Sequence, residues 1–591
     1  MAVMIVYGDH ERTESPRAVL ADLSKEAAAL TSLPPSLLRS AQAARVLIAA
    51  GELSQGLIDA FFHPRGVDAA GRVELLCGRL VHEAARVLLR SEQGDVDLNG
   101  HGLPKLLAWL GRARLPDEIV IKVPEGYAFY AVYPELYLQA AQALRDEAGG
   151  RVVAIGIRSI GTSLAAAVAA GAGATSPPRT LRPVGHPFGR SVSVAPSLEK
   201  KILREGSLFA IADEGPGLSG SSFGSVADWL EDRGVAPSQI VFFPSHRGNP
   251  GPHASERHRT RWQRARRLGV DFDSLFMSGP RPRLTAMIEA GAGAEVTGIE
   301  DISGGRWRAK LYRSPMEWPP ACPHRERRKF IAMAGGRPIL AKFNGLGRAG
   351  DERLERARRL GEFIPRTIGL AHGFLLSEWL SDARPIGPGE EMDRGRLVQV
   401  VGSYIGFLAR HLPAKRPGAS PERLLEMARF NTGQALGPDL GAELDRFQSR
   451  ISYFTRSARY VCTDNKLHLW EWLALPDGRL LKADALDHHA SHDLIGAQDP
   501  AWDIAGAFVE LSLIGEEQAA LLEAVARISP YRADRSSLLF YTACYLAFQL
   551  GYYSMAAAID GGSDEAERAR LEAARHRYQS RLAELLKGPM V

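Results

Sequence analysis

An acidic pair followed by a loop of glycines and serines is the stretch of this sequence best suited to chemistry. The stretch LFAIADEGPGLSGSSF spans residues 208–223, and Asp213 and Glu214 come directly after its small and apolar residues. This order predicts a buried strand that delivers two carboxylates to a turn before a helix. The carboxylates can hold a sugar diol or its Mg2+, and the loop can surround a 5′-phosphate with amides and hydroxyls. The residues expected at the phosphate are Gly217, Leu218, Ser219, Gly220, Ser221 and Ser222.

A second loop that suits phosphate comes one strand-helix unit earlier, in GIRSIGTS at residues 156–163. Arg158 can bind two phosphate oxygens in a fork, and the amino end of the helix that follows favours anions. The alternative is an ordinary strand-to-helix turn, in which Gly and Ser are common. The position of the loop, one unit before the acidic pair, adds weight to a pyrophosphate site. The residues assigned to it are Arg158, Ser159, Gly161, Thr162 and Ser163.

The run FAIA, the two acids and the following loop resemble the signature of the orotate-type phosphoribosyltransferases. The resemblance implies that the site binds phosphoribosyl pyrophosphate (PRPP) with Mg2+, and that Asp213 and Glu214 are catalytic residues at the ribose hydroxyls. Two departures are visible: Ser219-Gly220 lies one residue further from the acids than the usual Thr-Gly, and Glu214 replaces a second Asp. They make PRPP binding a firmer expectation than transferase activity.

These loops need a sheet to position them. Strand-like runs alternate with helical ones and predict a parallel sheet wrapped by helices over residues 115–290, with ligands at the carboxyl ends of the strands. The segment RPVGHPFGR contains His186, Arg182 and Arg190, and it stands where the resembling family carries a flexible lid. A surface loop with solvated charges is an equal alternative. The expected strands lie in EIVIKV, RVVAIGI, LRPV, LFAIA and QIVFF.

A second set of chemical signals begins near residue 298. The turn SGGR contains Gly304 and Gly305 between two strand-like pieces, as a loop over nucleotide phosphates would. A hairpin with a Gly-Gly turn follows, and its second strand carries Lys342, which can clamp the phosphates of ATP if an acid on a helix orients it. The candidate acid is Glu355, with Glu352 as the alternative. Glu378 stands in FLLSEWL, a strand expected to hold the nucleotide base through backbone groups.

Two aspartates flank a later hairpin predicted around Pro476-Asp477-Gly478. They are Asp464 and Asp484, which are 484 − 464 = 20 positions apart. This layout places one carboxylate near a substrate hydroxyl and the other near Mg2+.

Together these features resemble the aminoglycoside phosphotransferase and choline kinase type of small-molecule kinase. The most specific parts of the match are DGRLLKAD and QDPAWDIAGA. The resemblance implies that Lys342 clamps phosphate, that Asp464 is the catalytic aspartate and that Asp484 binds the metal. It departs from the family in Cys462-Thr463 before Asp464 and in Leu469 where an Asn is expected. The second metal ligand stays open between His468, Glu471 and Asn465, and the histidines of DALDHHASHD are expected around the phosphate site.

Length divides the chain into several units, since one core rarely grows beyond about 250–300 residues. With 591 residues, we expect a multidomain α/β protein in three parts. They are a helical N-terminal region (1–114), a parallel-sheet phosphoribosyltransferase-like domain (115–290) and a two-lobed α+β kinase-like domain (298–591).

Composition limits the class of protein. A hydrophobic content of 45% and a charged content of 24% are ordinary for a cytoplasmic globular protein, and no apolar run approaches the roughly 20 residues that span a bilayer. The amino terminus lacks the pattern of a secretory signal. A formal charge of +5 is small, so nucleic acid is not the expected partner, and a homodimer is possible. The four cysteines form no CxxC pair, which argues against zinc and against disulfides.

These observations favour a bifunctional cytoplasmic enzyme. One site would bind PRPP and the other would transfer phosphate from ATP with Mg2+, together making or modifying a nucleoside-like metabolite. The first alternative is a regulator that binds nucleotide or PRPP without consuming it. The second is a nucleic-acid-binding protein that uses the Arg-rich segment 254–267, although a solvated helix or a cover for the PRPP loop is the plainer interpretation of that segment.

Overall fold

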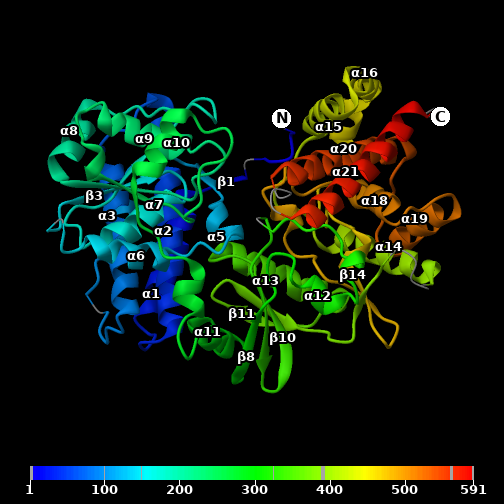
Figure 1. Cartoon of the computed structure of the whole chain (residues 1–591), viewed down its shortest axis with the longest axis horizontal. Coiled ribbons are helices and arrows are strands. Elements are labelled where there is room, and N and C mark those ends of the chain that lie inside the picture. The colour runs from blue at the N-terminus through cyan, green and yellow to red at the C-terminus, as the bar shows by residue number, and fades with distance from the viewer. Residues whose placement is uncertain are drawn as a thin grey trace.

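The chain folds around two five-stranded sheets of different kinds (Figure 1). The computed structural model describes residues 4–8, 10–98, 100–147, 149–323, 325–387, 393–559 and 564–588. Figure 1 shows the parallel sheet and its helices on one side and the C-terminal helices on the other, with the antiparallel sheet at the lower edge between them.

The parallel sheet has the strand order β4-β3-β5-β6-β7. A parallel sheet was predicted, but the expected strand in EIVIKV lies outside it, because this segment forms β2 (Ile119–Lys122), which pairs with β1 (Glu11–Glu14). The three central strands of the parallel sheet are buried along their whole length, which explains their uninterrupted apolar sequences. Alternate residues serve two cores: Val153 and Phe209 pack against α8, α9 and α10, whereas Ala154 and Ala210 pack against α7. The bounds are β3 (Val152–Ile157), β4 (Arg179–Leu181), β5 (Leu208–Ala212), β6 (Ile240–Phe243), β7 (Arg266–Arg267), α7 (Gly161–Gly171), α8 (Pro196–Glu205), α9 (Ser221–Glu231) and α10 (Glu256–Arg264).

The N-terminal region is helical, as expected, and it forms part of the same core. Its helices α2 and α3 pack on α7 and so cover one face of the parallel sheet. The approach is close, since a Cβ added at Gly51 of α2 would lie 2.8 Å from the Cβ of Ser163. Strands β1 and β2 form a separate two-stranded antiparallel sheet. The bounds are β1 (Glu11–Glu14), α1 (Pro16–Leu30), α2 (Leu37–Arg65), α3 (Arg72–Glu92), α4 (Leu103–Gly111), β2 (Ile119–Lys122), α5 (Glu125–Phe129) and α6 (Pro134–Ala141).

The second sheet is antiparallel, with the order β11-β12-β10-β9-β8. The predicted hairpin joins β9 to β10 through Gly335 and Gly336, whose φ angles of 55° and 75° suit a tight hairpin turn. Helix α11 packs against this sheet, so it belongs with the second sheet although the predicted boundary at residue 290 falls inside it. The bounds are α11 (Arg283–Ala292), β8 (Val296–Asp301), α12 (Arg308–Leu311), β9 (Lys329–Ala334), β10 (Arg337–Phe343), α13 (Arg348–Leu360), β11 (Thr367–Ala371) and β12 (Phe374–Glu378).

The C-terminal part is mainly helical and has its own apolar core. Its central helix α20 is buried on nearly all sides, as its sequence predicted. A three-stranded antiparallel sheet, β13-β14-β15, faces the second sheet from this part. The bounds are β13 (Arg384–Pro385), α14 (Arg394–His411), α15 (Pro421–Leu436), α16 (Pro438–Ala442), α17 (Ile451–Ser457), β14 (Trp472–Ala474), β15 (Leu480–Lys482), α18 (Pro500–Glu510), α19 (Glu516–Ile528), α20 (Arg535–Ile559) and α21 (Glu565–Lys587).

The first described residues lie against the C-terminal part (Figure 1). Val6 is buried there, and its carbonyl accepts a hydrogen bond from the amide of Leu494 at 2.8 Å. The amide of Gly8 donates to the carbonyl of His492 at 3.1 Å. The predicted opening strand MIVY is therefore an extended segment that ties the two ends of the sequence together, and regular pairing begins at β1.

Within the described ranges, no helix combines the length and the apolar character that a membrane span requires. All four cysteines are free thiols, in agreement with the absence of a disulfide pattern in the sequence.

Candidate functional site

The first candidate site is a cavity of about 310 Å³ between the antiparallel sheet and the C-terminal part. Lys342 reaches it from β10, and Asp484 reaches it from the turn after β15. The lysine Nζ lies 2.6 Å from Oδ1 of Asp484, so the two predicted residues meet although they are 142 positions apart. Burial by itself would raise the pKa of Asp484, but the positive charges of Lys342 and His488 outweigh burial and lower it.

Two further predicted features border this cavity. Glu378, at the end of β12, lines it together with Trp379 and Leu380, in the place expected for a nucleotide base. The Gly304-Gly305 turn follows β8, and the amide of Gly305 donates to Oε2 of Glu326 at 2.9 Å. The carboxylate of Glu326 also accepts from Nε1 of the neighbouring Trp307 at 2.7 Å. A carboxylate thus occupies donors of the loop predicted to cover phosphate.

The predicted role of Glu355 is wrong. Helix α13 turns Arg353 and Arg356 inward, and Glu355 is exposed on its outer face. Arg356 donates to the carbonyls of Ala485 and Cys462, each at 2.7 Å, so α13 holds the loops of the site through an arginine. The carboxylate partner of Lys342 is Asp484, from the opposite side of the cavity.

Asp464 lies behind the wall of the cavity, which corrects its predicted contact with a substrate hydroxyl. Its side chain is completely buried, and it accepts a hydrogen bond of 2.6 Å from the hydroxyl of Tyr404. Burial would raise its pKa, but Lys482, His488 and Tyr404 lower it to about 2. Lys466, two residues later, lines the cavity and lies 3.5 Å from Asp493.

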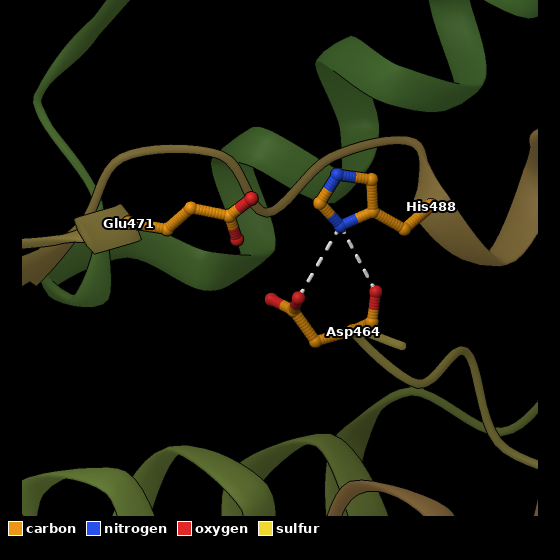
Figure 2. A group of neighbouring side chains, drawn as sticks. All are labelled: Asp464, Glu471 and His488. Carbon is orange, nitrogen blue, oxygen red and sulfur yellow. Dashed lines mark hydrogen bonds and ion pairs between the residues drawn. The ribbon is translucent and has the colours of Figure 1, made fainter. Parts of the chain in front are cut away.

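Of the three candidates for a second metal ligand, Glu471 alone points at Asp464 (Figure 2). His468 lies 3.3 Å from Glu510, and the side chain of Asn465 donates to the carbonyl of Gly496 at 2.8 Å. Ligand atoms of Asp464, Glu471 and His488 lie within 4.8 Å of one another.

A second group of potential metal ligands comprises Asp484, Asp487 and His488. Asp484 is the more accessible ligand, because its side chain is 30% exposed, whereas that of Asp487, which pairs with Arg327, is 4% exposed. Nδ1 of His488 faces two acceptors of Asp464, the carbonyl at 3.1 Å and Oδ1 at 3.3 Å, so this nitrogen carries a proton (Figure 2). Oxygen ligands at Asp484 fit Mg2+, which is usually bound through one or two carboxylates together with substrate phosphates.

The other histidines of the predicted cluster have different surroundings. His492 packs against the rings of Tyr7, Phe129 and Tyr130, at the contact between the two parts of the molecule. His489 is half-buried in the C-terminal part, and its partial burial, with Arg356 and Arg353 nearby, lowers its pKa. His488 is the member of the cluster that reaches the metal-ligand groups.

The second candidate site is a cleft of about 710 Å³ at the carboxyl ends of β3 and β5. Asp213 and Glu214 line it, as the sequence predicted. Burial raises the pKa of Asp213 to about 7. The pKa of Glu214 is raised to about 8 by burial and by the charges of Glu125 and Asp213. The amide of Gly126 donates to Glu214 at 2.7 Å, so α5 positions this carboxylate.

Arg158 does not serve as the predicted pyrophosphate ligand. Its side chain is completely buried, and its guanidinium pairs with Asp59 at 2.8 Å and with Asp68. Asp59 comes from α2 and Asp68 from the loop after it, so the N-terminal region supplies the charges that hold this arginine. Arg182 also pairs with Asp59 and lines the cleft, while exposed Arg190 donates to Ser222 at 3.0 Å.

Several of the predicted phosphate-binding hydroxyls are engaged inside the protein. Ser163 is buried and bonded to the hydroxyl of Tyr127 at 2.7 Å, and Thr162 is buried beside it. Ser219 and Ser221 donate to the carbonyl of Pro187, at 3.0 and 2.6 Å. Gly161 is needed for packing, since a Cβ there would lie 2.6 Å from the carbonyl of Ala212. The predicted loop residues that line the cleft are Arg158, Ser159, Gly217 and Ser222.

The Arg-rich segment packs onto α9 through ion pairs. Arg261 lies 2.6 Å from Glu231, and Arg257 lies 2.9 Å from Asp228. Trp262 is buried against the parallel sheet. This arrangement matches the expected cover for the acidic loop.

Sequence reasoning missed Lys466 and Lys482, although a signal for the second was present. A lysine inside the apolar strand LLK, two residues before a predicted metal ligand, is unusual because a buried lysine needs a partner. The two cavities also share wall residues, Phe129 and Glu326, which no local pattern indicated.

A scan with protein-family models finds no match, and a search of the curated proteins finds none either. Among solved structures, the chain is similar to the choline kinase LicA from Streptococcus pneumoniae, with 13% identity, 50% of this chain and 99% of that chain covered, and a TM-score of 0.32. A choline/ethanolamine kinase family protein from Mesorhizobium loti has 15% identity, with 48% and 94% covered and a TM-score of 0.35. A type I macrolide 2′-phosphotransferase has 17% identity, with 50% and 95% covered and a TM-score of 0.32. Each match covers about half of this chain, and at these TM-scores the likeness assigns no residue and no substrate.

Proposed function

We propose that this chain is an ATP-dependent phosphotransferase that acts on a hydroxyl of a small molecule. The observation that carries the proposal is the meeting of Lys342 and Asp484 across a cavity of about 310 Å³, with their charged atoms 2.6 Å apart. A lysine on a sheet strand opposite an aspartate suits a bound triphosphate, because the lysine can pair with phosphate while the aspartate holds its Mg2+.

In this proposal each residue has one task. When nucleotide enters, Lys342 leaves Asp484 and pairs with the phosphates. Backbone groups at the end of β12, near Glu378, receive the base. Mg2+, when bound, neutralises charge on the transferring phosphoryl group. The carboxylate best placed to orient an acceptor hydroxyl is Glu471, since it lines the cavity and Asp464 does not. Asp464 is a positioning residue that holds Lys482 and His488.

Calorimetric titration with ATP and Mg2+ tests the binding step. The native chain and the control Lys25→Ala, an exposed lysine on α1, should bind ATP alike, and Lys342→Ala should bind it much more weakly. ADP release should then be followed with nucleosides, amino alcohols and amino sugars as acceptors. Equal affinity for ATP in Lys342→Ala would refute the assignment of the Lys342 cavity as the ATP site. Tight binding of ATP without turnover would favour a regulator.

A second function is supported by the cleft at the parallel sheet. We infer that it binds a sugar phosphate of the PRPP type with Mg2+, because two half-buried carboxylates face a cleft that also holds Arg182, Arg190 and Ser222. The carboxylates suit a diol or a metal, and the arginines suit phosphate. Titration with PRPP and Mg2+ should give saturable heat in the native chain and in Asp232→Ala, an exposed control at the end of α9, but not in Asp213→Ala. No heat from folded native protein would overturn this function.

The shared walls at Phe129 and Glu326 support a sequence of two reactions. A sugar-containing product of the parallel-sheet site would carry free hydroxyls, which are the groups that the kinase-like site would phosphorylate. Incubation with PRPP, ATP and a base or amine acceptor should then give a product whose mass includes both the phosphoribosyl and the phosphoryl group. Mass spectra that show singly modified products alone would contradict the sequence of two reactions.

A further inference from the structure

We propose that the ammonium group of Lys482 is a built-in cation that takes the place of a second metal ion, so that the kinase-like site binds one divalent cation, at Asp484. This inference rests on the proposed phosphotransferase function. It concerns the group formed by Asp464, Glu471 and His488, whose ligand atoms are close enough to hold a metal (Figure 2).

The position of the ammonium group is fixed by three oxygen atoms. Its Nζ lies 2.6 Å from Oε2 of Glu471, 3.4 Å from Oδ1 of Asp464 and 2.5 Å from the carbonyl of Asp484. These are the oxygens that would face a cation placed between the two carboxylates. The side chain of Lys482 is completely buried, so the cation is shielded from solvent.

Electrostatics explain why a cation is required at this place. Two carboxylates that approach one another in a buried site cannot both ionise unless positive charge lies between them. The ammonium group of Lys482, 2.6 Å from Glu471 and 3.4 Å from Asp464, therefore offsets one of their two negative charges without a metal.

Lys342, which lines the cavity, behaves differently from Lys482. Lys342 comes from the opposing sheet, and its partner Asp484 is 30% exposed, so nucleotide phosphate can replace the lysine there and Mg2+ can reach the carboxylate. Lys482 and the hairpin that carries Glu471 belong to the same small sheet, where Lys482 stands opposite Trp472. Lys342 and its acid therefore come from different parts of the molecule, whereas Lys482 and Glu471 come from the same hairpin.

Counting bound Mn2+ tests the proposal directly. Paramagnetic titration of the native chain with Mn2+ and a non-hydrolysable ATP analogue should give one ion per chain. Lys482→Ala leaves two carboxylates and a vacant space, so it should bind one more ion than the native chain, and it should do so without nucleotide as well. Two ions in the native chain, or no additional ion in the variant, would overturn the inference.

The arm without nucleotide separates this inference from the proposed function. If the native chain fails to bind the ATP analogue, the phosphotransferase proposal fails, while the additional Mn2+ of Lys482→Ala still decides the role of the lysine. The matched control is Lys482→Ala combined with Glu471→Gln, which removes one carboxylate and should lose the additional ion.

A second variant and a measurement of melting temperature distinguish the loss of the lysine charge from a folding defect in Lys482→Ala. Lys482→Gln keeps most of the side-chain volume without the charge, and it should also gain a Mn2+ site. In both variants Mn2+ should raise the melting temperature in a saturable manner and by more than in the native chain. A lysine with a merely structural role predicts the same loss of stability in the variants but no specific recovery with Mn2+.

Discussion

The two candidate sites treat their carboxylates in opposite ways. At the parallel sheet, Asp213 and Glu214 have raised pKa values of about 7 and about 8, because burial is not offset by a close cation. Behind the wall of the cavity that Lys342 lines, Lys482 and its neighbours lower the pKa of Asp464 to about 2. The cleft at the parallel sheet is therefore suited to receive a cation or a diol, whereas Asp464 is already paired with a buried cation.

The largest expected effect separates structural from ligand-binding arginines. Arg158→Ala should lower the apparent free energy of unfolding by about 3–5 kcal/mol, because it leaves Asp68 buried without a guanidinium partner and leaves Asp59 with Arg182 as its arginine partner. Thermal unfolding measures this, with the exposed Arg259→Ala as the control. Normal stability combined with lost PRPP binding would instead return Arg158 to the pyrophosphate.

The next largest effect is expected on phosphotransfer, and it tests whether Lys342 acts on phosphate. Lys342→Ala should reduce kcat/KM for phosphotransfer by about 10²–10³-fold, the range found when one group that stabilises transition-state charge is removed. Steady-state ADP release with a responsive acceptor measures it. A change of less than twofold would remove Lys342 from the phosphate site and weaken the contrast between the sites.

The raised pKa values of Asp213 and Glu214 and the lowered pKa of Asp464 predict that the contributions of these carboxyls to stability change with pH in opposite directions. A carboxyl whose folded-state pKa is raised binds more protons in the folded than in the unfolded state, so its contribution to stability falls as pH rises from about 4 to about 8. Asp213→Asn should flatten this decline in melting temperature, and Mg2+ with PRPP should also reduce it.

Asp464 provides the opposite case. Its lowered pKa means that its contribution is present above the unfolded value of 3.8 and is lost as pH falls through about 2. Melting temperatures of Asp464→Asn should therefore show their deficit at neutral pH and lose it in acid. A matching deficit at every pH would show that the charge of Asp464 contributes little.

The smallest effect is expected at Arg190, the exposed arginine of the cleft at the parallel sheet. Arg190→Ala should weaken PRPP binding by about tenfold, the loss expected for one hydrogen bond to a charged group, without a change in melting temperature. Calorimetric titration beside Arg158→Ala sharpens the comparison, since one arginine should affect affinity and the other stability. An unchanged affinity would exclude Arg190 from phosphate binding.

Much of the frame was predictable because it depends on local patterns. The buried strands LFAIA and QIVFF are continuous apolar runs, and the Gly335-Gly336 turn permits the positive φ angles of a tight hairpin. The expected cover of the acidic loop by the Arg-rich segment also rests on short-range features, since α9 and α10 are close in the sequence. Helix α13 was predicted, but its inward face was not, because a helix rich in both charges can turn either one inward.

The sequence by itself determined the strands, the turns and the carboxylates at the ends of strands, because spacing and turn chemistry act over a few residues. Only the tertiary structure decided which charges meet. Arg158 is held by acids that are 90 and 99 positions away, and Lys342 meets an aspartate 142 positions away. A buried charge must find an opposite charge wherever packing brings one, so the partner is set by the whole fold.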